Sequence, residues 1–89
     1  MISEEDRDRI IDIGRRFGVS KILLFGSAAS ESNAAKDIDL AVSGVPASRF
    51  FEFYGELLFS LSKPVDLIDL SRDSRFTRMV LAEGIPLYG

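Results

Sequence analysis

The sequence predicts an α/β fold, in which helices pack against a small mixed β-sheet. Short strand-like segments at residues 21–25, 37–42 and 65–70 alternate with longer segments whose apolar residues recur at helical spacing. The 89 residues are enough for one domain, residues 1–89, and too few for two. With 46% hydrophobic and 28% charged residues, the composition is that of a folded globular domain rather than of a disordered chain.

The first predicted element is a helix that begins after Ser3 and ends near Gly18. Ser3 can accept a hydrogen bond from an early backbone N–H, and the three acidic residues that follow it suit the positive end of a helix dipole. Ile10, Ile13 and Phe17 then share one face, which we expect to lie in the core.

Two strands are predicted next. Residues 21–25 form a short apolar run that ends at Gly26 and Ser27. From residue 37 onward the chain alternates, and its two faces carry two different sets of side chains, Ile38, Leu40 and Val42 on one and Asp37, Asp39 and Ala41 on the other.

Residues 47–61 are predicted to form a long helix because six apolar residues recur at helical spacing: Phe50, Phe53, Tyr54, Leu57, Leu58 and Leu61. Phe51 and Phe59 widen this apolar arc beyond what a helix with one buried side needs. Either the helix is buried on two sides in a thick core, the more common arrangement in a small domain, or its extra apolar side binds a partner.

The last part of the sequence predicts a strand, a helix and a short strand. Residues 65–70 form the strand, and residues 71–83 form the helix, with Phe76, Met79 and Val80 facing inward. Gly84 ends this helix, and residues 86–88 form the closing strand.

Composition excludes several classes of function. The sequence has no cysteine and no histidine, which removes disulfides, thiolate or imidazole metal sites and Ser–His or Cys–His nucleophile pairs. Any metal is therefore expected to be a hard cation held by oxygen. A net charge of −3 gives no broad positive field for a nucleic acid, so we expect no direct nucleic-acid partner. We also expect no membrane segment, and a cytoplasmic location.

Asp37 and Asp39 are the clearest candidates for chemistry. Two positions apart on a strand, they lie on the same face, about 7 Å apart at the backbone, so their carboxylates can converge on one divalent cation. Taken alone, an Asp-x-Asp pair is more often simply a pair of solvated strand residues without function. A third acid comes from the strand at 65–70, where alternation allows either Asp66 or Asp69, but not both, to join a site on one face.

Gly26 and Ser27 follow a predicted strand, nine residues before Asp37. Glycine lets the backbone approach a ligand closely, and Ser27 offers a hydroxyl and an N–H where a helix can begin, an arrangement suited to phosphate. The alternative is an ordinary turn, because Gly-Ser is common in loops.

Taken together, these features resemble the minimal nucleotidyltransferases of the DNA polymerase beta-like superfamily. The resemblance rests on the segments 24–27 (Leu-Phe-Gly-Ser) and 37–40 (Asp-Ile-Asp-Leu), supported by the later strand with Asp66 and the closing residues 83–88. It implies a nucleotidyltransferase-like fold in which Gly26 and Ser27 hold the phosphates of ATP. Asp37 and Asp39 would bind two Mg²⁺ ions, and Asp66 would ligate the second ion or take a proton.

The length and one departure from the family pattern narrow the expected function. Members that act on polynucleotides need further domains, and small members are similar to antitoxins whose partner is an all-helical HEPN toxin. The resemblance implies AMP transfer from ATP to a tyrosine of that toxin within a hetero-oligomer. The wide apolar face around Phe51, Tyr54, Leu58 and Phe59 is the candidate contact surface, with a thick core as its alternative. Ser30 stands where active members usually carry an arginine, so a second hypothesis is a catalytically degenerate module that neutralises its partner by binding alone.

Overall fold

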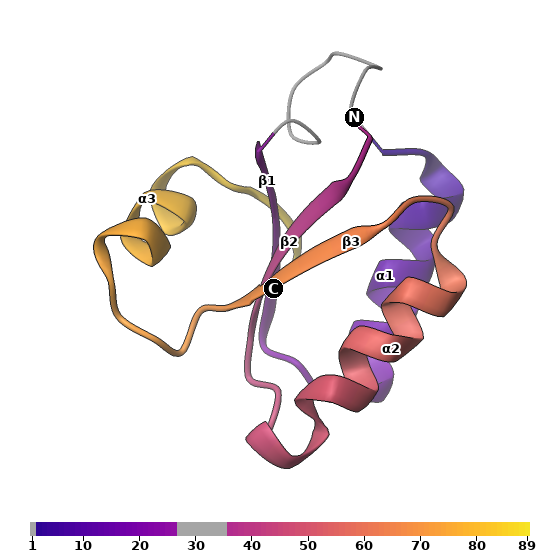
Figure 1. Ribbon diagram of the computed structural model, residues 1–89, viewed down its shortest axis with the longest axis horizontal. Helices are drawn as coiled ribbons and strands as arrows, with labels where there is room; N and C mark the ends of the chain where they lie inside the picture. Colours follow the sequence, from indigo (N-terminus) through magenta and orange to yellow (C-terminus); the bar gives the residue numbers. More distant parts are fainter. Residues whose placement is uncertain (1, 27–35) are drawn as a thin grey trace.

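The computed structural model describes residues 2–26 and 36–89 (Figure 1). The helices and strands follow one another in the predicted order: α1 (Glu4–Arg16), β1 (Lys21–Phe25), β2 (Ile38–Ser43), the short 3-10 helix η2 (Ala47–Arg49), α2 (Phe50–Ser60), β3 (Val65–Asp69), α3 (Arg75–Glu83) and β4 (Ile85–Tyr88). The predicted α/β class and the closing strand are confirmed. Among the described residues, no helix is long and apolar enough to cross a membrane.

The four strands form one mixed sheet in the order β3-β2-β1-β4. β1 pairs antiparallel with both β2 and β4, whereas β2 and β3 run parallel. Helices α1 and α2 cover one face of this sheet, and α3 lies on the other (Figure 1). The two faces therefore have different surroundings, and the residue alternation of each strand decides which of them a side chain meets.

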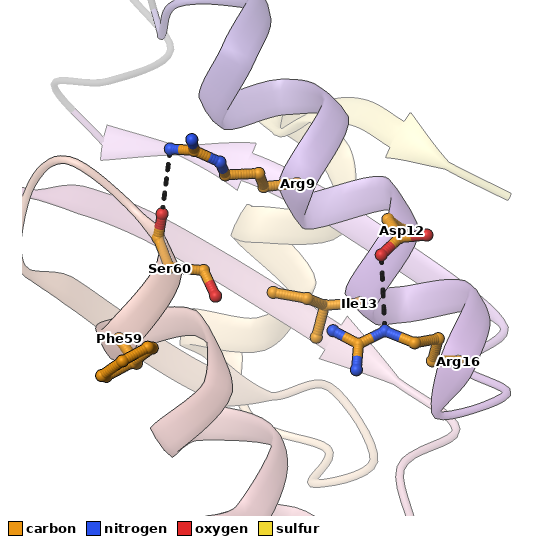
Figure 2. Close-up of a pocket in the computed structure, with 6 residues that line it drawn as sticks. All are labelled: Arg9, Asp12, Ile13, Arg16, Phe59 and Ser60. Carbon is orange, nitrogen blue, oxygen red and sulfur yellow. Dashed lines mark hydrogen bonds and ion pairs between the residues drawn. The ribbon is translucent and has the colours of Figure 1, made fainter.

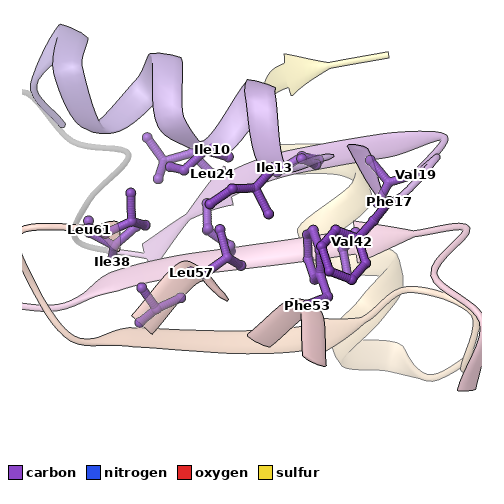
Figure 3. Close-up of a cluster of buried hydrophobic side chains, with 13 residues drawn as sticks. Ile10, Ile13, Phe17, Val19, Leu24, Ile38, Val42, Phe53, Leu57 and Leu61 are labelled. Atoms are coloured by element: carbon purple, nitrogen blue, oxygen red, sulfur yellow. The ribbon is translucent and has the colours of Figure 1, made fainter. Parts of the chain in front are cut away.

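The main core lies between the sheet and helices α1 and α2 (Figure 3). The buried side chains of this cluster are Ile10, Ile13, Phe17, Val19, Ile22, Leu24, Ile38, Leu40, Val42, Phe53, Leu57, Leu61 and Val65. Each fully buried side chain of this size contributes about 1.5–3 kcal/mol of hydrophobic free energy. The rings of Phe17 and Phe53 meet edge-on with their centroids 5.2 Å apart, which joins α1 to α2. The predicted inward face of α1 is confirmed, and on α2 it is confirmed for Phe53, Leu57 and Leu61.

Asp6 joins the start of α1 to the segment after α2. Ser3 caps the helix as predicted, because its hydroxyl accepts from the Asp6 backbone N–H at 3.1 Å. The Asp6 side chain is only 3% exposed and accepts hydrogen bonds from the backbone N–H of Ser62, at 3.1 Å, and from the Ser62 hydroxyl. Sequence patterning treated Asp6 as one of three acids at a helix start and gave no sign of this contact.

Helix α2 is narrower on its buried side than the sequence predicted. Phe53 and Leu57 are fully buried, but Phe51 is 84% exposed and Phe59 is 93% exposed. The prediction that α2 is buried on two sides is therefore wrong for Phe51 and Phe59, because α1 and the sheet cover only one side of this helix. Tyr54 belongs to the core side instead, since its hydroxyl donates to the carbonyl oxygen of Val65 at 2.6 Å.

Helix α3 begins four residues later than predicted, at Arg75. Asp69 accepts a hydrogen bond from the backbone N–H of Ser71, which holds a turn there, and Ser74 caps the helix through a reciprocal bond with Thr77. Val80 is buried as predicted. Phe76 and Met79 are not, and remain 47% and 48% exposed, because α3 alone covers its face of the sheet.

Candidate active site

Two carboxylates lie side by side on the sheet face that carries α3. In the parallel pairing of β2 and β3, Asp39 is the direct partner of Asp66. Asp69 pairs with Val42 on the other face of the sheet, and its carboxylate accepts from Ser71 at 2.9 Å. Of the two acids on β3, the structure thus brings Asp66 next to Asp39 and leaves Asp69 outside the site.

The surroundings of Asp39 favour its neutral form or a bound cation. Partial burial raises the pKa of Asp39, and the adjacent Asp66 raises it further through its negative charge and a shared side-chain hydrogen bond. Asp37 adds a third, smaller contribution in the same direction. Carboxylates held this closely need a proton or a cation between them, so the site stores repulsion that a divalent ion can relieve.

Gly26 lies directly against the side chain of Asp39. Its φ of +67° lies in the left-handed region, and a Cβ built on it would overlap the Asp39 Oδ2 atom. The register explains this contact, because Phe25 is the antiparallel partner of Asp39 and Gly26 comes directly after it. Glycine at this position therefore allows the backbone of the β1 turn to lie against a carboxylate.

Asp37 lies just before β2, which begins at Ile38. The predicted strand 37–42 therefore begins one residue later than expected, and Asp37 is the residue directly before it. Asp37 is exposed and still acts on Asp39 through its charge.

The surface groove between α1 and α2 is a different feature. Figure 2 shows Arg9, Asp12 and Arg16 on α1 facing Phe59 and Ser60 on α2. Arg9 donates to the Ser60 carbonyl oxygen at 3.1 Å, and Arg16 pairs with Asp12 at 3.4 Å. These helices cover the sheet face opposite Asp39 and Asp66, so this groove is not part of the carboxylate site.

The sequence profile described as polymerase beta, nucleotidyltransferase matches residues 8–89. The matched region includes Gly26 and all three predicted site carboxylates. The chain belongs to the polymerase beta nucleotidyltransferase family.

Several solved structures similar to this nucleotidyltransferase come from toxin–antitoxin complexes. A tri-AMPylated HEPN toxin of Shewanella oneidensis in complex with its MNT antitoxin gives a match of 29% identity and TM-score 0.72, over 94% of this chain and 70% of the other. A toxin–antitoxin structure with AMP-PNP gives 29% identity and TM-score 0.77, over 93% and 73%. An MntA–HepT variant with two aspartates, two positions apart, changed to glutamate gives 27% and 0.75, over 93% and 72%. No curated protein matches the chain.

The donor set of the nucleotidyltransferase site fits Mg²⁺ by its chemistry. Mg²⁺ prefers hard oxygen ligands and keeps several waters, so two or three carboxylates are enough to hold it. Asp39 and Asp66 supply two such groups side by side, and the glycine turn leaves room for the Asp39 carboxylate. Within residues 2–26 and 36–89, no three acidic side chains converge closely enough to form a complete ligand set.

Two residues named in the sequence analysis lie outside the described residues: Ser27, which is predicted to bind phosphate, and Ser30, which stands at the position of the usual arginine. Lys36, the first residue described after them, is exposed and precedes β2. The described part of the site therefore comprises the Asp39–Asp66 pair, Asp37 and Gly26.

Proposed function

We propose that this nucleotidyltransferase transfers AMP from ATP to a tyrosine hydroxyl of a HEPN toxin, and so acts as its antitoxin. The Asp39–Asp66 pair carries the proposal, because two adjacent carboxylates beside a glycine turn are the groups that Mg²⁺-dependent phosphoryl chemistry requires. The similarity to a tri-AMPylated HEPN toxin complex and to a complex with AMP-PNP supports the choice of nucleotide and partner.

Each residue has a distinct role in this proposal. Gly26 and Ser27 hold the β- and γ-phosphates, and Asp37 and Asp39 hold two Mg²⁺ ions. Bound there, Mg²⁺ neutralises charge on the triphosphate and lowers the pKa of the acceptor hydroxyl. Asp66 ligates at the acceptor side or accepts the hydroxyl proton.

The bond changes follow from these positions. The tyrosine oxygen forms a bond to the α-phosphorus of ATP, and the bond from that phosphorus to the bridging oxygen of the β-phosphate breaks. Pyrophosphate leaves with the bonding electron pair, and the hydroxyl proton passes to Asp66 or to water. The transfer needs no redox partner and no nucleophile from this chain.

The exposed apolar residues of α2 are the proposed contact surface for the toxin. Phe51, Leu58 and Phe59 project from this helix with 84%, 48% and 93% of their surface exposed. Exposed aromatic residues are enriched where proteins bind one another. Because α2 lies on the face opposite the carboxylates, the same surface favours a second candidate function, neutralisation by binding alone.

Calorimetric titration separates these two functions from a domain with no nucleotide site. Mg²⁺-ATP is titrated into the wild-type chain, into Asp39→Asn and into the matched control Asp8→Asn, which changes an exposed acid on α1. Binding that is retained in Asp8→Asn and lost in Asp39→Asn supports the nucleotidyl-transfer site. Absence of binding in the wild-type chain, alone and with a purified HEPN toxin present, would reject it.

A transfer assay tests the acceptor. The chain is incubated with a HEPN toxin, Mg²⁺ and ATP labelled at the α-phosphate, and the label is followed by mass spectrometry. Label on a toxin tyrosine that disappears with the double change Asp39→Asn and Asp66→Asn supports catalysis. Full neutralisation of the toxin by that double variant would instead support binding alone.

A further inference from the structure

A second pocket lies next to the carboxylate site, between the end of β1 and α3. It has a volume of about 410 Å³ and is lined by Phe25, Gly26, Phe76, Met79, Val80 and Glu83. This volume falls within the range of small-molecule sites. Gly26 belongs to both places, because its Cα lies against Asp39 on one side and it lines the pocket on the other.

The walls of this pocket suit a flat ring. Phe25 and Phe76 meet edge-on, with centroids 5.9 Å apart and planes at 78°. Phe76 is 47% exposed and Met79 is 48% exposed, so part of the Phe76 ring and of the Met79 side chain remains free to contact a ligand. Aromatic rings stack on planar bases, and thioethers make favourable contacts with aromatic rings.

The position of the pocket indicates which ring it receives. The strand order places β2 between β1 and β3, so Phe25 lies on one side of Asp39 and Asp66 on the other. Neighbouring strands are about 4.8 Å apart, which separates the pocket from Asp66 by about two strand spacings. In the proposed function the acceptor hydroxyl lies at Asp66, whereas the triphosphate lies at Gly26. The pocket is therefore on the nucleotide side.

Glu83 gives the pocket rim a hydrogen-bond preference. It is exposed in the last turn of α3, where the helix dipole disfavours a negative charge and where no basic residue offsets it. A carboxylate only accepts hydrogen bonds, so it favours a base edge that donates, such as the amino group of adenine.

We propose that this pocket binds the base of the nucleoside triphosphate, with Phe25, Phe76 and Met79 contacting the ring and Glu83 accepting from its amino group. The inference rests on the proposed function, because it takes the triphosphate to lie at Gly26. It adds the residues that recognise the base and the direction in which the nucleotide lies across the sheet.

The test compares a probe that has a base with one that has none. Mg²⁺-ATP and Mg²⁺ with inorganic triphosphate are titrated into the wild-type chain, Phe76→Ala and the control Leu81→Ala, which shortens a side chain of similar exposure outside the pocket on the same helix. We expect Phe76→Ala to weaken ATP binding about 10-fold and to leave triphosphate binding unchanged. Leu81→Ala should change neither affinity.

The inorganic triphosphate separates loss of the pocket from loss of the fold or of the whole site. A misfolded Phe76→Ala chain would lose both probes, in which case Met79→Ala replaces it in the same comparison. Equal affinities of the wild-type chain for ATP and triphosphate would overturn the base pocket and leave the proposed function standing. No binding of either probe to the wild-type chain would overturn both.

Two further probes test the specificity of the pocket. Purine riboside triphosphate has the ring without the amino group, and we expect it to bind about 3- to 10-fold more weakly than ATP. Equal binding would overturn the role of Glu83. N-acetyltyrosinamide represents the acceptor ring, and binding of this compound that Phe76→Ala abolishes would assign the pocket to the acceptor and overturn the proposal.

Discussion

The Cα atom of Gly26 lies against the carboxylate of Asp39, so the turn after β1 and the acid on β2 occupy their positions together. The antiparallel pairing of Phe25 with Asp39 brings the two residues to the same end of the sheet. This contact explains why residue 26 is a glycine without reference to any ligand.

Replacing Gly26 with alanine should disrupt the carboxylate site. The substitution puts a Cβ where the Asp39 carboxylate lies and places alanine at a positive φ. Gly18→Ala is a matched control, since Gly18 has a similar φ of +69° and open space around it. Gly18→Ala should cost about 1–2 kcal/mol of unfolding free energy from the backbone alone, and Gly26→Ala should cost more. Urea denaturation measures both, and equal losses would contradict the contact.

The repulsion around Asp39 predicts a pH-dependent stability in the absence of Mg²⁺. Because burial, Asp66 and Asp37 raise its pKa, the folded chain binds a proton at Asp39 more tightly than the unfolded chain does. The stabilisation is fully present below the ordinary value of 3.8 and is lost as the pH rises through the raised value. In EDTA, the free energy of unfolding should therefore fall as the pH rises from 3.8 through the raised pKa of Asp39. Asp39→Asn should reduce this dependence on pH. An unchanged slope in Asp39→Asn would contradict this origin.

Mg²⁺ and ATP should reverse the order of stability of the wild-type chain and Asp39→Asn. In EDTA, Asp39→Asn removes one of the facing charges and should melt at or above the wild-type temperature. With Mg²⁺ and ATP present, ligand binding should raise the melting temperature of the wild-type chain and leave that of the variant unchanged. A wild-type melting temperature that does not respond to Mg²⁺ and ATP would argue against the site.

Loss of the Asp6 carboxylate should destabilise the whole domain. Asp6→Ala removes the buried carboxylate that accepts from the N–H and hydroxyl of Ser62, at a cost of about 1–3 kcal/mol. Glu5→Ala removes an exposed ion pair with Arg9, and should cost no more than about 0.5 kcal/mol. Thermal or urea unfolding compares the two, and a similar small loss in both would show that the Asp6 contact contributes little.

Replacing Gly55 with alanine should have opposite effects on the stability of the fold and on partner binding. It lies inside α2, midway between Phe51 and Phe59, and a Cβ added there would meet no other atom. Gly55→Ala should thus stabilise the isolated chain by about 0.5–1 kcal/mol. If a toxin approaches α2 closely between the two exposed rings, the same change should weaken the complex. Stabilisation with unchanged toxin affinity would place the contact elsewhere.

The order of helices and strands was predictable because it depends on local patterns. Apolar spacing located α1 and α2, alternation located β2, and Ser3 marked the start of α1. The start of α3 was predicted too early because the turn that delays it depends on the Asp69 side chain, whose hydrogen bond to Ser71 is visible only in the structure.

The candidate site was predictable in its residue types but not in its geometry. Alternation narrowed the third acid to Asp66 or Asp69, and the family resemblance chose Asp66. Only the parallel register of β2 and β3, a contact between distant segments, shows that Asp66 lies beside Asp39. The half-exposed positions of Phe76 and Met79 were not predictable, because helical spacing does not reveal how much of a sheet one helix can cover. Asp6 carried no signal, since an acid in the first turn of a helix is ordinary at the surface.

The exposed aromatic residues of α2 and the Asp39–Asp66 pair lie on opposite faces of one sheet. A toxin held on α2 would leave the carboxylates of that chain open to ATP. A protein that only covers its partner must be made at least mole for mole with it, whereas one that modifies and releases its partner can be outnumbered. The toxin-to-antitoxin ratio at which cell growth is inhibited therefore shows whether α2 or the carboxylate face neutralises the toxin.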